Sequence, residues 1–286
     1  MIKDRSYKPV DDEIVYHYCR PDAFLEIVRS GTIWHSAYTV LNDTMEREWG
    51  YRIFIEVTEA LKEECGADFI DRIQAIVKMS QTNSAAMISS YSLNGDVLSQ
   101  WRAYADDGRG FAIGFSTRDM DMPAKPLKVL YDRAAQIKEL TGNIRHVFQH
   151  ERSIGFKYND EFLAHWYTLG LDLCAYKNPA FAEEMEIRRV HISLALEEVT
   201  RRVIPIGAID RQNVRRSPPV QVDFRVSNGV LIPYVVLDYT DGGKNEPLKE
   251  VVLGPKNANL ESNVEILLST MGLNNVAIKR SQAPYR

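Results

Sequence analysis

The chain has 286 residues, of which 45% are hydrophobic and 26% are charged, a composition typical of globular proteins. A chain of this length buries enough surface to be stable without metals or disulfides. Lys and Arg number 35 against 39 Asp and Glu, so the net charge of −4 gives no overall basic field for a nucleic-acid partner. The three cysteines show no CxxC spacing, which argues against a disulfide framework and a structural zinc site and favours a reducing compartment.

The sequence shows no segment that would direct the chain to a membrane. The first ten residues lack the apolar core of a signal peptide, and no stretch approaches the ~18 apolar residues of a membrane span. No internal repeat or low-complexity segment is found either. We therefore expect a cytoplasmic protein without a membrane partner, folded as a single domain over 1–286, with helical insertions near 51–80 and 133–176.

Hydrophobic periodicity predicts a mixture of strands and helices. In chain order these are a strand at 14–19, a helix at 21–30 that Gly31 ends, a strand at 33–37, a helical hairpin at 51–79 broken at Cys65-Gly66, a strand at 85–92, a helix at 97–105, strands at 111–115 and 127–131, a largely helical region at 137–176, strands at 185–192, 230–239 and 248–253, a helix at 261–271 and a strand at 275–280. Because the strands cluster instead of alternating strictly with helices, this order predicts an α+β fold with a largely antiparallel sheet.

Some of these boundaries depend on particular residues. Asp96 is expected to cap the helix that follows it, and the segment 42–46 has the Asp and Glu of a capping box. The turn residues Asp241-Gly242-Gly243 are expected to join the strands on either side of them as a pair. Helix breaks are expected at Gly142, Gly155 and Gly170.

Familiar nucleotide-binding and hydrolase motifs are missing from the sequence. Gly242-Gly243-Lys244 lacks the GxxxxGK[ST] frame of a phosphate loop, no GxGxxG opens a helix, and no GxSxG elbow occurs. His146 and His150 lie on one face of a predicted helix, but Val147 stands where a zinc protease has Glu. We therefore favour an exposed helix face over a metal site that would include His165.

The first candidate group for function is the histidine of the first strand. His17 alternates with Tyr16 and Tyr18, so its side chain lies on the opposite face of that strand. A buried histidine must find hydrogen-bond partners. His17 therefore either bonds a neighbouring carbonyl or reaches into a pocket.

Two further groups lie on later strands. The small side chains of Ser89-Ser90-Tyr91-Ser92 either let a ligand approach closely or fit beneath Trp101 and Tyr104. One face of the strand predicted at 185–192 carries Glu184, Glu186 and Arg188. This pattern is typical of a solvated strand face, but two carboxylates beside an arginine could instead stabilise a positive charge that develops on a substrate.

The order of these motifs resembles the bacterial family called domain of unknown function 2971. The resemblance runs from about Val15 to the C-terminus and rests on the number and order of its motifs. The motifs are Tyr16-His17-Tyr18, Leu41-Asn42-Asp43 with Glu46, Tyr91-Ser92 followed by Trp101 and Tyr104-Ala105, 110–115, 181–188, Val251-Val252-Leu253-Gly254-Pro255 and 281–286.

The resemblance implies a remote relation to ADP-ribosyltransferase-like folds, in which a bent or split β-sheet holds NAD in a cleft. Such folds carry His or Arg on the first strand, Ser, Thr or Tyr on a middle strand, and Glu late in the chain. Matched residue by residue, the first place falls to His17, the second to Ser92 or Tyr91, and the third to Glu186 or Glu184. The pair Glu184-x-Glu186 is also similar to the ExE pattern of transferases that modify arginine, which carry Arg on the first strand.

This resemblance makes NAD the expected substrate of an ADP-ribosyltransferase or NAD glycohydrolase-like enzyme. Departure of nicotinamide leaves a positively charged, oxocarbenium-like ribose, which Glu186 would stabilise. His17 would hold the ribose, Ser92 would position the nicotinamide or brace the Glu, and all three are expected to line one concave pocket. The expected NAD-binding residues are Tyr16, Tyr18, Tyr91, Trp101, Tyr104, Glu184 and Arg188. No metal is expected, and the acceptor is open among water, protein and nucleic acid.

Two other functions stay open at this point. A module that binds a nucleotide or sugar without turnover would use the same cleft. A metal-dependent nuclease would hold Mg²⁺ by hard oxygen ligands, drawn from Asp43, Glu46, Asp96, Glu184 and Glu186. If Glu186 is a poised catalytic carboxylate, Glu186→Gln is expected to change the stability by less than about 1 kcal/mol.

Overall fold

The computed structural model describes residues 6–10, 13–38, 44–196, 203–205, 218–227 and 229–285. Its strands are β1 (Ile14–Cys19), β2 (Thr32–Ala37), β3 (Ser84–Ser92), β4 (Phe111–Ser116), β5 (Lys125–Lys128), β6 (Glu186–Leu196), β7 (Val203–Pro205), β8 (Asp223–Ser227), β9 (Val230–Asp238), β10 (Leu248–Leu253) and β11 (Ala277–Arg280). Its α-helices are α1 (Pro21–Ser30), α2 (Thr44–Ala60), α3 (Lys62–Cys65), α4 (Ala67–Asn83), α5 (Leu98–Tyr104), α6 (Arg133–Ser153), α7 (Asp160–Asp172) and α8 (Glu261–Thr270). The described ranges also contain the 3₁₀ helices η2 (Asp106–Gly108), η3 (Leu173–Ala175) and η4 (Pro179–Glu184).

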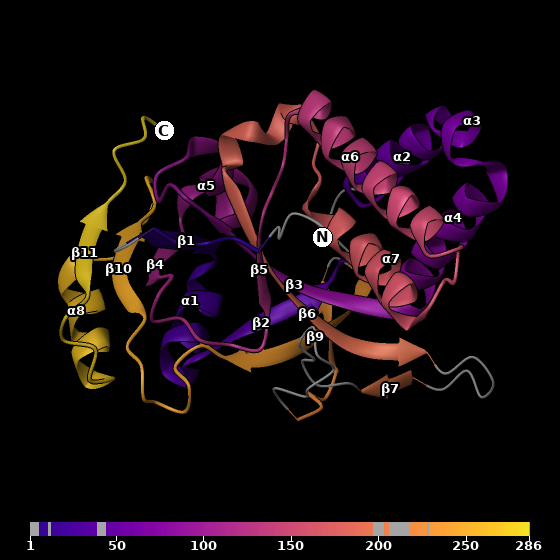
Figure 1. Ribbon diagram of the computed structural model, residues 1–286. Coiled ribbons are helices and arrows are strands. Elements are labelled where there is room, and N and C mark those ends of the chain that lie inside the picture. The colour runs from indigo at the N-terminus through magenta and orange to yellow at the C-terminus, as the bar shows by residue number, and fades with distance from the viewer. Residues whose placement is uncertain are drawn as a thin grey trace.

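The described strands form one mostly antiparallel sheet (Figure 1). Its main path runs β11-β10-β4-β1-β3-β2-β9-β8, and β5, β6 and β7 join it through the pairing of β6 with β3. The pair β10–β11 is parallel, whereas the other strand pairs are antiparallel. The sequence prediction of an α+β fold with a largely antiparallel sheet is therefore confirmed.

The sheet divides along one edge of β3. On its other edge β3 pairs with β6 over its whole length, from Ser84 to Ser92. On the dividing edge, β1 meets β3 at Tyr16 opposite Ser92, and β2 meets it at Ser36 and Ala37, opposite Ile88 and Met87. Between these two contacts, residues 89–91 of β3 pair with neither strand. The two halves of the sheet separate at this point, which opens a gap beside the middle of β3.

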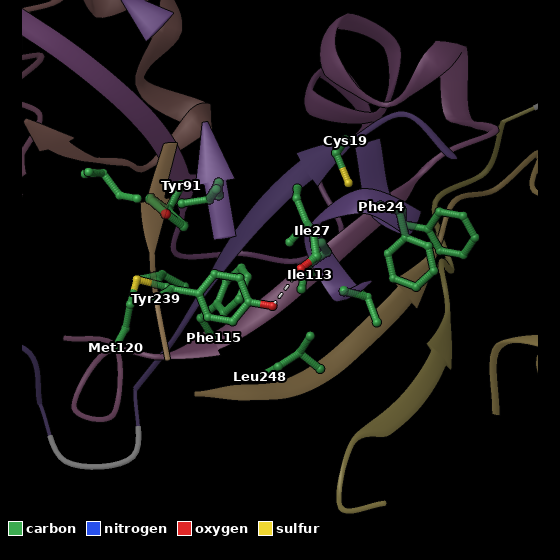
Figure 2. Packing of buried hydrophobic residues seen from close by; sticks show 14 of the residues in the cluster. Cys19, Phe24, Ile27, Tyr91, Ile113, Phe115, Met120, Tyr239 and Leu248 are labelled. Atoms are coloured by element: carbon green, nitrogen blue, oxygen red, sulfur yellow. Dashed lines mark hydrogen bonds between the residues drawn. The ribbon is translucent and has the colours of Figure 1, made fainter. Parts of the chain in front are cut away.

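Helices cover the two faces of the sheet in different ways. On the face that we call the α1 face, an apolar core joins the strands to Phe24 and Ile27 of α1 and to Leu268 of α8. Figure 2 shows this core, including Tyr239, whose hydroxyl donates to the carbonyl oxygen of Ile27 at 3.0 Å. On the opposite face, the α5 face, Trp101 of α5 packs beneath the β1–β4 side of the sheet.

The longer helices form a lobe at one end of the sheet, as Figure 1 shows. This lobe consists of α2, α3, α4, α6 and α7 and has an apolar core of its own, with Phe54 and Trp166 fully buried. A smaller cluster that includes Leu171, Cys174 and Val190 connects the lobe to the α5 face of the sheet. The two predicted insertions thus pack on each other. None of the described helices is long and apolar enough to cross a membrane.

Several predicted boundaries differ from the structure. The helices α6 and α7 continue through Gly142 and Gly170, whereas Gly155, with φ 75°, does separate them. Gly170 is a packing residue, because a Cβ there would meet the Ser80 side chain. Asp96 does not cap α5, whose N-cap is Val97, since its carboxylate is used by Trp101 and the C-terminal segment instead.

The strand pairing near the C-terminus also differs from the prediction. The strands β9 and β10 do not pair with each other: β9 pairs with β2 and β8, and β10 pairs with β4 and β11. The turn at 241–243 is present, with positive φ at all three residues, but the strands that it connects lie on different halves of the divided sheet. The sequence did not predict β7 and β8, and the predicted capping at 42–46 lies partly outside the described residues.

Candidate functional site

The gap in the sheet exposes one residue of a central strand. Ser90 is exposed, although its neighbours Ser89 and Tyr91 are only 4% and 2% exposed. Its hydroxyl lies on the α5 face, between α5 and the helical lobe. Ser90 is exposed where β3 has no strand partner on its β1/β2 edge. We call this exposed position and the side chains around it the Ser90 site.

His17 borders the Ser90 site from β1. Its Nδ1 lies 2.9 Å from the carbonyl oxygen of Ser90, which lacks a backbone partner because the strands have separated. A carbonyl oxygen accepts only, so Nδ1 carries the proton and Nε2 is left as an acceptor. Nε2 has no hydrogen-bond partner within the described part of the chain, and the side chain is half-buried. Burial lowers the pKa of His17, so the ring is neutral at pH 7.

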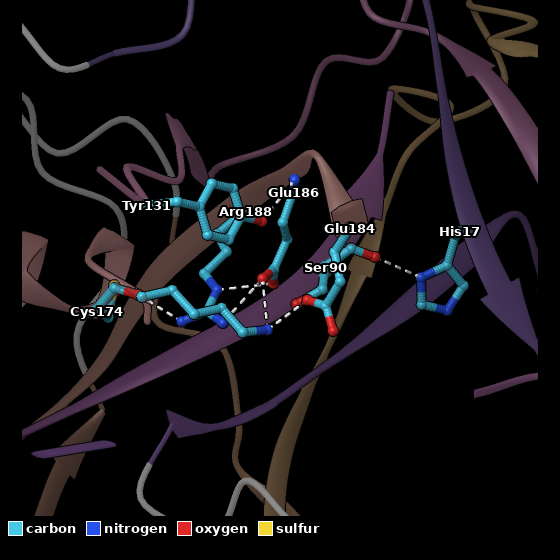
Figure 3. A network of polar contacts seen from close by, with 8 residues as sticks. His17, Ser90, Tyr131, Cys174, Glu184, Glu186 and Arg188 are labelled. Carbon is cyan, nitrogen blue, oxygen red and sulfur yellow. Dashed lines mark hydrogen bonds and ion pairs between the residues drawn. The ribbon is translucent and has the colours of Figure 1, made fainter. Parts of the chain in front are cut away.

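Four charged side chains line the other side of the site (Figure 3). Arg188 donates to Glu186 through Nε at 2.7 Å and through Nη2 at 3.0 Å, a bidentate ion pair. Lys177 Nζ lies 3.2 Å from Glu186 Oε2 and also bonds Glu184. Arg188 also donates to the Cys174 carbonyl oxygen. These residues, Lys177, Glu184, Glu186 and Arg188, form what we call the four-charge cluster, and their exposed fractions are 7% or less.

The chain forms this cluster through a local turn. Glu184 ends the 3₁₀ helix η4, and Met185 adopts a left-handed conformation with φ 44° before β6 begins. Because strand alternation then places Glu186 and Arg188 on the same face, their side chains meet. Lys177 is brought beside them by the hydrogen bond from its backbone N–H to the Leu130 carbonyl oxygen, 3.1 Å long.

The cluster keeps Glu186 ionised. Burial opposes ionisation, but the charges of Arg188 and Lys177, together with hydrogen bonds from Arg188 and Ser90, outweigh it and lower the pKa of Glu186 to about 2. Two carboxylates and two cations cancel, so the cluster carries no net charge. The backbone N–H of Glu186 donates to the Tyr131 hydroxyl at 3.0 Å, which fixes the strand end. Glu186 is therefore a rigid, ionised and charge-compensated carboxylate.

Strand register separates the three predicted catalytic side chains. Tyr16, Ser92 and Glu186 share one row across β1, β3 and β6, on the α5 face. His17 starts from the α1 face, where its ring lies 5.6 Å from that of Tyr91, and it reaches Ser90 only through the gap. Ser92 is buried, and its Oγ accepts from the backbone N–H of Asn94 at 3.1 Å. Ser90 therefore occupies the position between His17 and Glu186 at which the sequence analysis expected Ser92.

The aromatic side chains expected to stack on a ligand are mostly part of the core. Tyr18 and Trp101 pack edge to face at 4.8 Å and are 6% and 0% exposed. Tyr91 is also buried, whereas Tyr104 is 41% exposed. Tyr16 is half-buried and donates to Glu250 at 3.2 Å. Of these rings, Tyr104 and Tyr16 present accessible surface in this structure.

Two residues of the site were missed by the sequence analysis. The sequence singled out Ser90 only as one of the four residues Ser89-Ser90-Tyr91-Ser92. Exposure of a single residue on a central strand produces no periodic pattern in the sequence that could have identified it. Lys177 precedes Asn178-Pro179, a loop sequence in which a lone lysine is ordinarily solvated. Its burial at 2% exposure follows from the two carboxylates that surround it, and these lie seven and nine residues further along the chain.

The acidic residues proposed for a nuclease are not gathered around one point. Within the described ranges, no group of three or more His, Cys, Asp or Glu side chains has an arrangement that could hold a metal ion. Asp96 accepts from Trp101 Nε1 and from the backbone N–H of Gln282, both at 2.7 Å. Asp43 lies outside the described residues, and so does the side chain of Glu46.

Two surface hollows lie away from the Ser90 site. One, of about 240 Å³, is bordered by Gly31 and Tyr239, and the other, of about 310 Å³, is bordered by Glu265 and Val276. Neither is lined by a predicted site residue. The Ser90 site is recognised instead by the exposure of one residue within the sheet.

Comparison with known proteins identifies the family of the central region. Residues 100–189 match the family described as "Protein of unknown function (DUF2971)". The match includes Trp101, Tyr104 and all four members of the four-charge cluster, whereas His17 and Ser90 precede it. No curated protein and no solved structure matches the chain. The match over residues 100–189 therefore supports the domain of unknown function 2971 family that the sequence motifs predicted.

Proposed function

We propose that the chain binds NAD or a related nucleotide at the Ser90 site and acts as an ADP-ribosyltransferase or NAD glycohydrolase-like enzyme. The observation that carries the proposal is the exposure of Ser90 in the gap of a divided sheet, between an acceptor nitrogen of His17 and the ionised carboxylate of Glu186. A divided sheet with His on its first strand and Glu late in the chain is the arrangement that the family resemblance implied.

The chemistry assigned to these residues is cleavage of the bond between ribose C1′ and the nicotinamide nitrogen. The bonding electrons leave with nicotinamide, which becomes neutral, and positive charge develops on the ribose. A carboxylate that is already ionised stabilises this charge electrostatically. An acceptor hydroxyl, from water, a protein or a nucleic acid, then bonds C1′ and releases its proton to solvent.

His17 has a separate role in this proposal. Its neutral ring offers Nε2 as a hydrogen-bond acceptor, which suits a ribose hydroxyl or an amide N–H of the ligand. The Ser90 hydroxyl lies between His17 and Glu186 and can bond the same ribose. No step requires a metal. Cys19, Cys65 and Cys174 are buried and form no disulfide, which fits a reducing cytoplasmic location for this activity.

A second candidate, nucleotide binding without turnover, is favoured by the neutrality of the four-charge cluster. Because Arg188 and Lys177 compensate Glu186, the cluster attracts a developing positive charge less than a lone carboxylate would. Binding needs only the exposed site and its hydrogen-bonding groups. The two candidates share a ligand and differ in whether NAD is consumed.

The test combines a binding and a turnover measurement on the purified full chain. NAD at about a hundred times its dissociation constant should stabilise the fold by roughly 2.7 kcal/mol, which a thermal unfolding curve detects. Release of nicotinamide is followed by chromatography in the presence of EDTA. Ser90→Leu removes the hydroxyl and covers the site with a larger side chain, so it should abolish both signals, whereas the control Ser262→Leu, at an exposed position of α8, should keep them. If NAD, ADP-ribose and nicotinamide at millimolar concentration all leave the unfolding curve unchanged, the proposal is refuted.

A further inference from the structure

A second group of buried polar side chains lies on the α1 face of the sheet, on the opposite side from the four-charge cluster. His35, Ser89 and Arg189 form one row across β2, β3 and β6, and His191 follows two residues further along β6. Their exposed fractions are 0%, 4%, 7% and 1%. His35 Nε2 lies 2.9 Å from Ser89 Oγ, so these two side chains satisfy each other. Arg189 and His191 are not satisfied in this way.

Arg189 is a buried cation without a counterion. Its Nη2 donates to the Met120 carbonyl oxygen at 3.1 Å, and it forms no ion pair within the described part of the chain. Burial lowers its pKa, while Tyr91 and the exposed Asp121 act on its charge from a distance. The adjacent Arg188, on the other face, is neutralised by Glu186. A guanidinium stays charged at neutral pH, and burying a charge without a partner is costly.

His191 supplies a second unsatisfied group on the same face. Its Nδ1 lies 2.6 Å from the Pro123 carbonyl oxygen, so Nδ1 carries the proton. Its Nε2 is sealed from solvent and has no hydrogen-bond partner. Arg189 has guanidinium nitrogens that form no hydrogen bond with the described residues. These nitrogens are not buried, so they are accessible to solvent. The row therefore lacks a hydrogen-bond partner at His191 and a counterion at Arg189, and it is accessible to solvent at Arg189.

We propose that Arg189 and His191 form a binding site for an oxyanion, the phosphate or carboxylate group of a small molecule. Alternate residues of a strand lie about 6.7 Å apart on the same face. The two side chains are therefore neighbours, and an oxyanion has several acceptor oxygens, so it can accept hydrogen bonds from both. It supplies the missing counterion of Arg189, and it lets His191 take up a proton on Nε2 and donate it. Because the site lies on the opposite face from the four-charge cluster, it stands independently of the function proposed above.

The test measures anion binding by calorimetry and by thermal unfolding at constant ionic strength, with sodium chloride as the balancing salt. The probes are inorganic phosphate and succinate. Wild type should bind one of them and unfold at a higher temperature in its presence, and the probe that acts identifies the group as phosphate or carboxylate. Arg189→Gln and His191→Gln should each weaken binding at least tenfold. Arg225→Gln, which changes an exposed arginine of β8, should leave binding unchanged.

A second measurement separates an anion site from a purely structural arginine. In buffer free of both probes, Arg189→Gln should unfold at the same temperature as wild type or higher, because it removes an uncompensated buried charge. If Arg189 serves only to hold the loop at Met120, the variant instead unfolds at a lower temperature and responds to the probes as wild type does. That result, or the absence of any response of wild type to either probe, would overturn the proposal.

Discussion

Replacement of Glu186 by Gln distinguishes what the four-charge cluster does for the fold from what it does for a ligand. The structure gives Glu186 an exposed fraction of 5% and contacts with Arg188 and Lys177. Gln keeps the shape of the side chain but removes its charge, so the cluster is left with one carboxylate and two buried cations. We therefore expect a strongly destabilised protein, in contrast to the change of less than about 1 kcal/mol expected from the sequence for a poised catalytic carboxylate.

The magnitude follows from the pKa of Glu186. A carboxyl whose pKa falls from 4.5 in the unfolded chain to about 2 in the folded protein contributes roughly 3 kcal/mol at neutral pH, at about 1.4 kcal/mol for each factor of ten in the acid constant. Removal of one partner of a buried ion pair typically costs about 3–5 kcal/mol. For a chain of this length, these values lower the unfolding temperature by about 5–8 °C.

The assay is urea and thermal unfolding at pH 7 of wild type, Glu186→Gln and the control Glu183→Gln. Glu183 is an exposed carboxylate of the same segment, so its replacement should change the stability by less than about 0.5 kcal/mol. The double variant Glu186→Gln, Arg188→Gln should recover part of the loss because it removes a stranded cation. The reasoning is refuted if Glu186→Gln is as stable as the control.

Three further predictions follow from individual contacts. The stabilisation due to Glu186 is present above pH 4.5 and is lost as the pH falls toward 2, so acid-dependent urea unfolding should be less steep for Glu186→Gln than for wild type. Gly142→Ala should stabilise the protein by about 0.5–1 kcal/mol, because a Cβ at this helical position contacts no other atom. Gly170→Ala should destabilise the protein by about 1–3 kcal/mol, because its Cβ would meet Ser80 and lie 3.1 Å from the Val77 carbonyl oxygen. Urea unfolding of both variants checks that the two changes in stability have opposite signs. Asp96→Ala removes the acceptor of Trp101 Nε1 and Gln282 N–H, so limited trypsin digestion should cut after Arg280 faster than in wild type, and equal rates would contradict this contact.

The elements with a strong periodic signal could be predicted from the sequence. The strand at 14–19 and the helix at 21–30 match β1 and α1, and Gly31 ends that helix with φ 66°. The helical hairpin breaks at Cys65-Gly66 as expected. In each case, neighbouring residues determine the structure: an apolar run, a helical spacing, or a glycine that tolerates a left-handed backbone.

Features that depend on contacts between distant segments could not be predicted in this way. Gly170 was expected to break a helix, but its function is to let α7 approach Ser80 of α4. The turn at 241–243 was read as a hairpin signal, although the strands beside it find their partners in β2 and β4. Local sequence indicates a turn, whereas the choice of strand partner depends on the whole sheet.

The candidate site shows the same limit at the level of single residues. Alternation along β1 correctly placed His17 on the opposite face from Tyr16, and alternation along β6 placed Glu186 beside Arg188. The sequence could not predict that β1 and β2 separate from β3 at different residues. Because they do, the Ser90 carbonyl oxygen has no backbone donor, and His17 Nδ1 donates to it instead.

The position of Lys177 determines how the cluster could act on a ligand. A developing positive charge on ribose is stabilised only if a carboxylate oxygen lies closer to it than the cations that compensate that carboxylate. Both oxygens of Glu186 are bonded to Arg188, and one also to Lys177, while Glu184 bonds the same lysine from the other side. If a ligand displaces Lys177 and bonds one of the carboxylates, the remaining side chains Glu184, Glu186 and Arg188 carry a net negative charge. Catalysis by Glu186 therefore requires Lys177 to move, whereas binding alone does not.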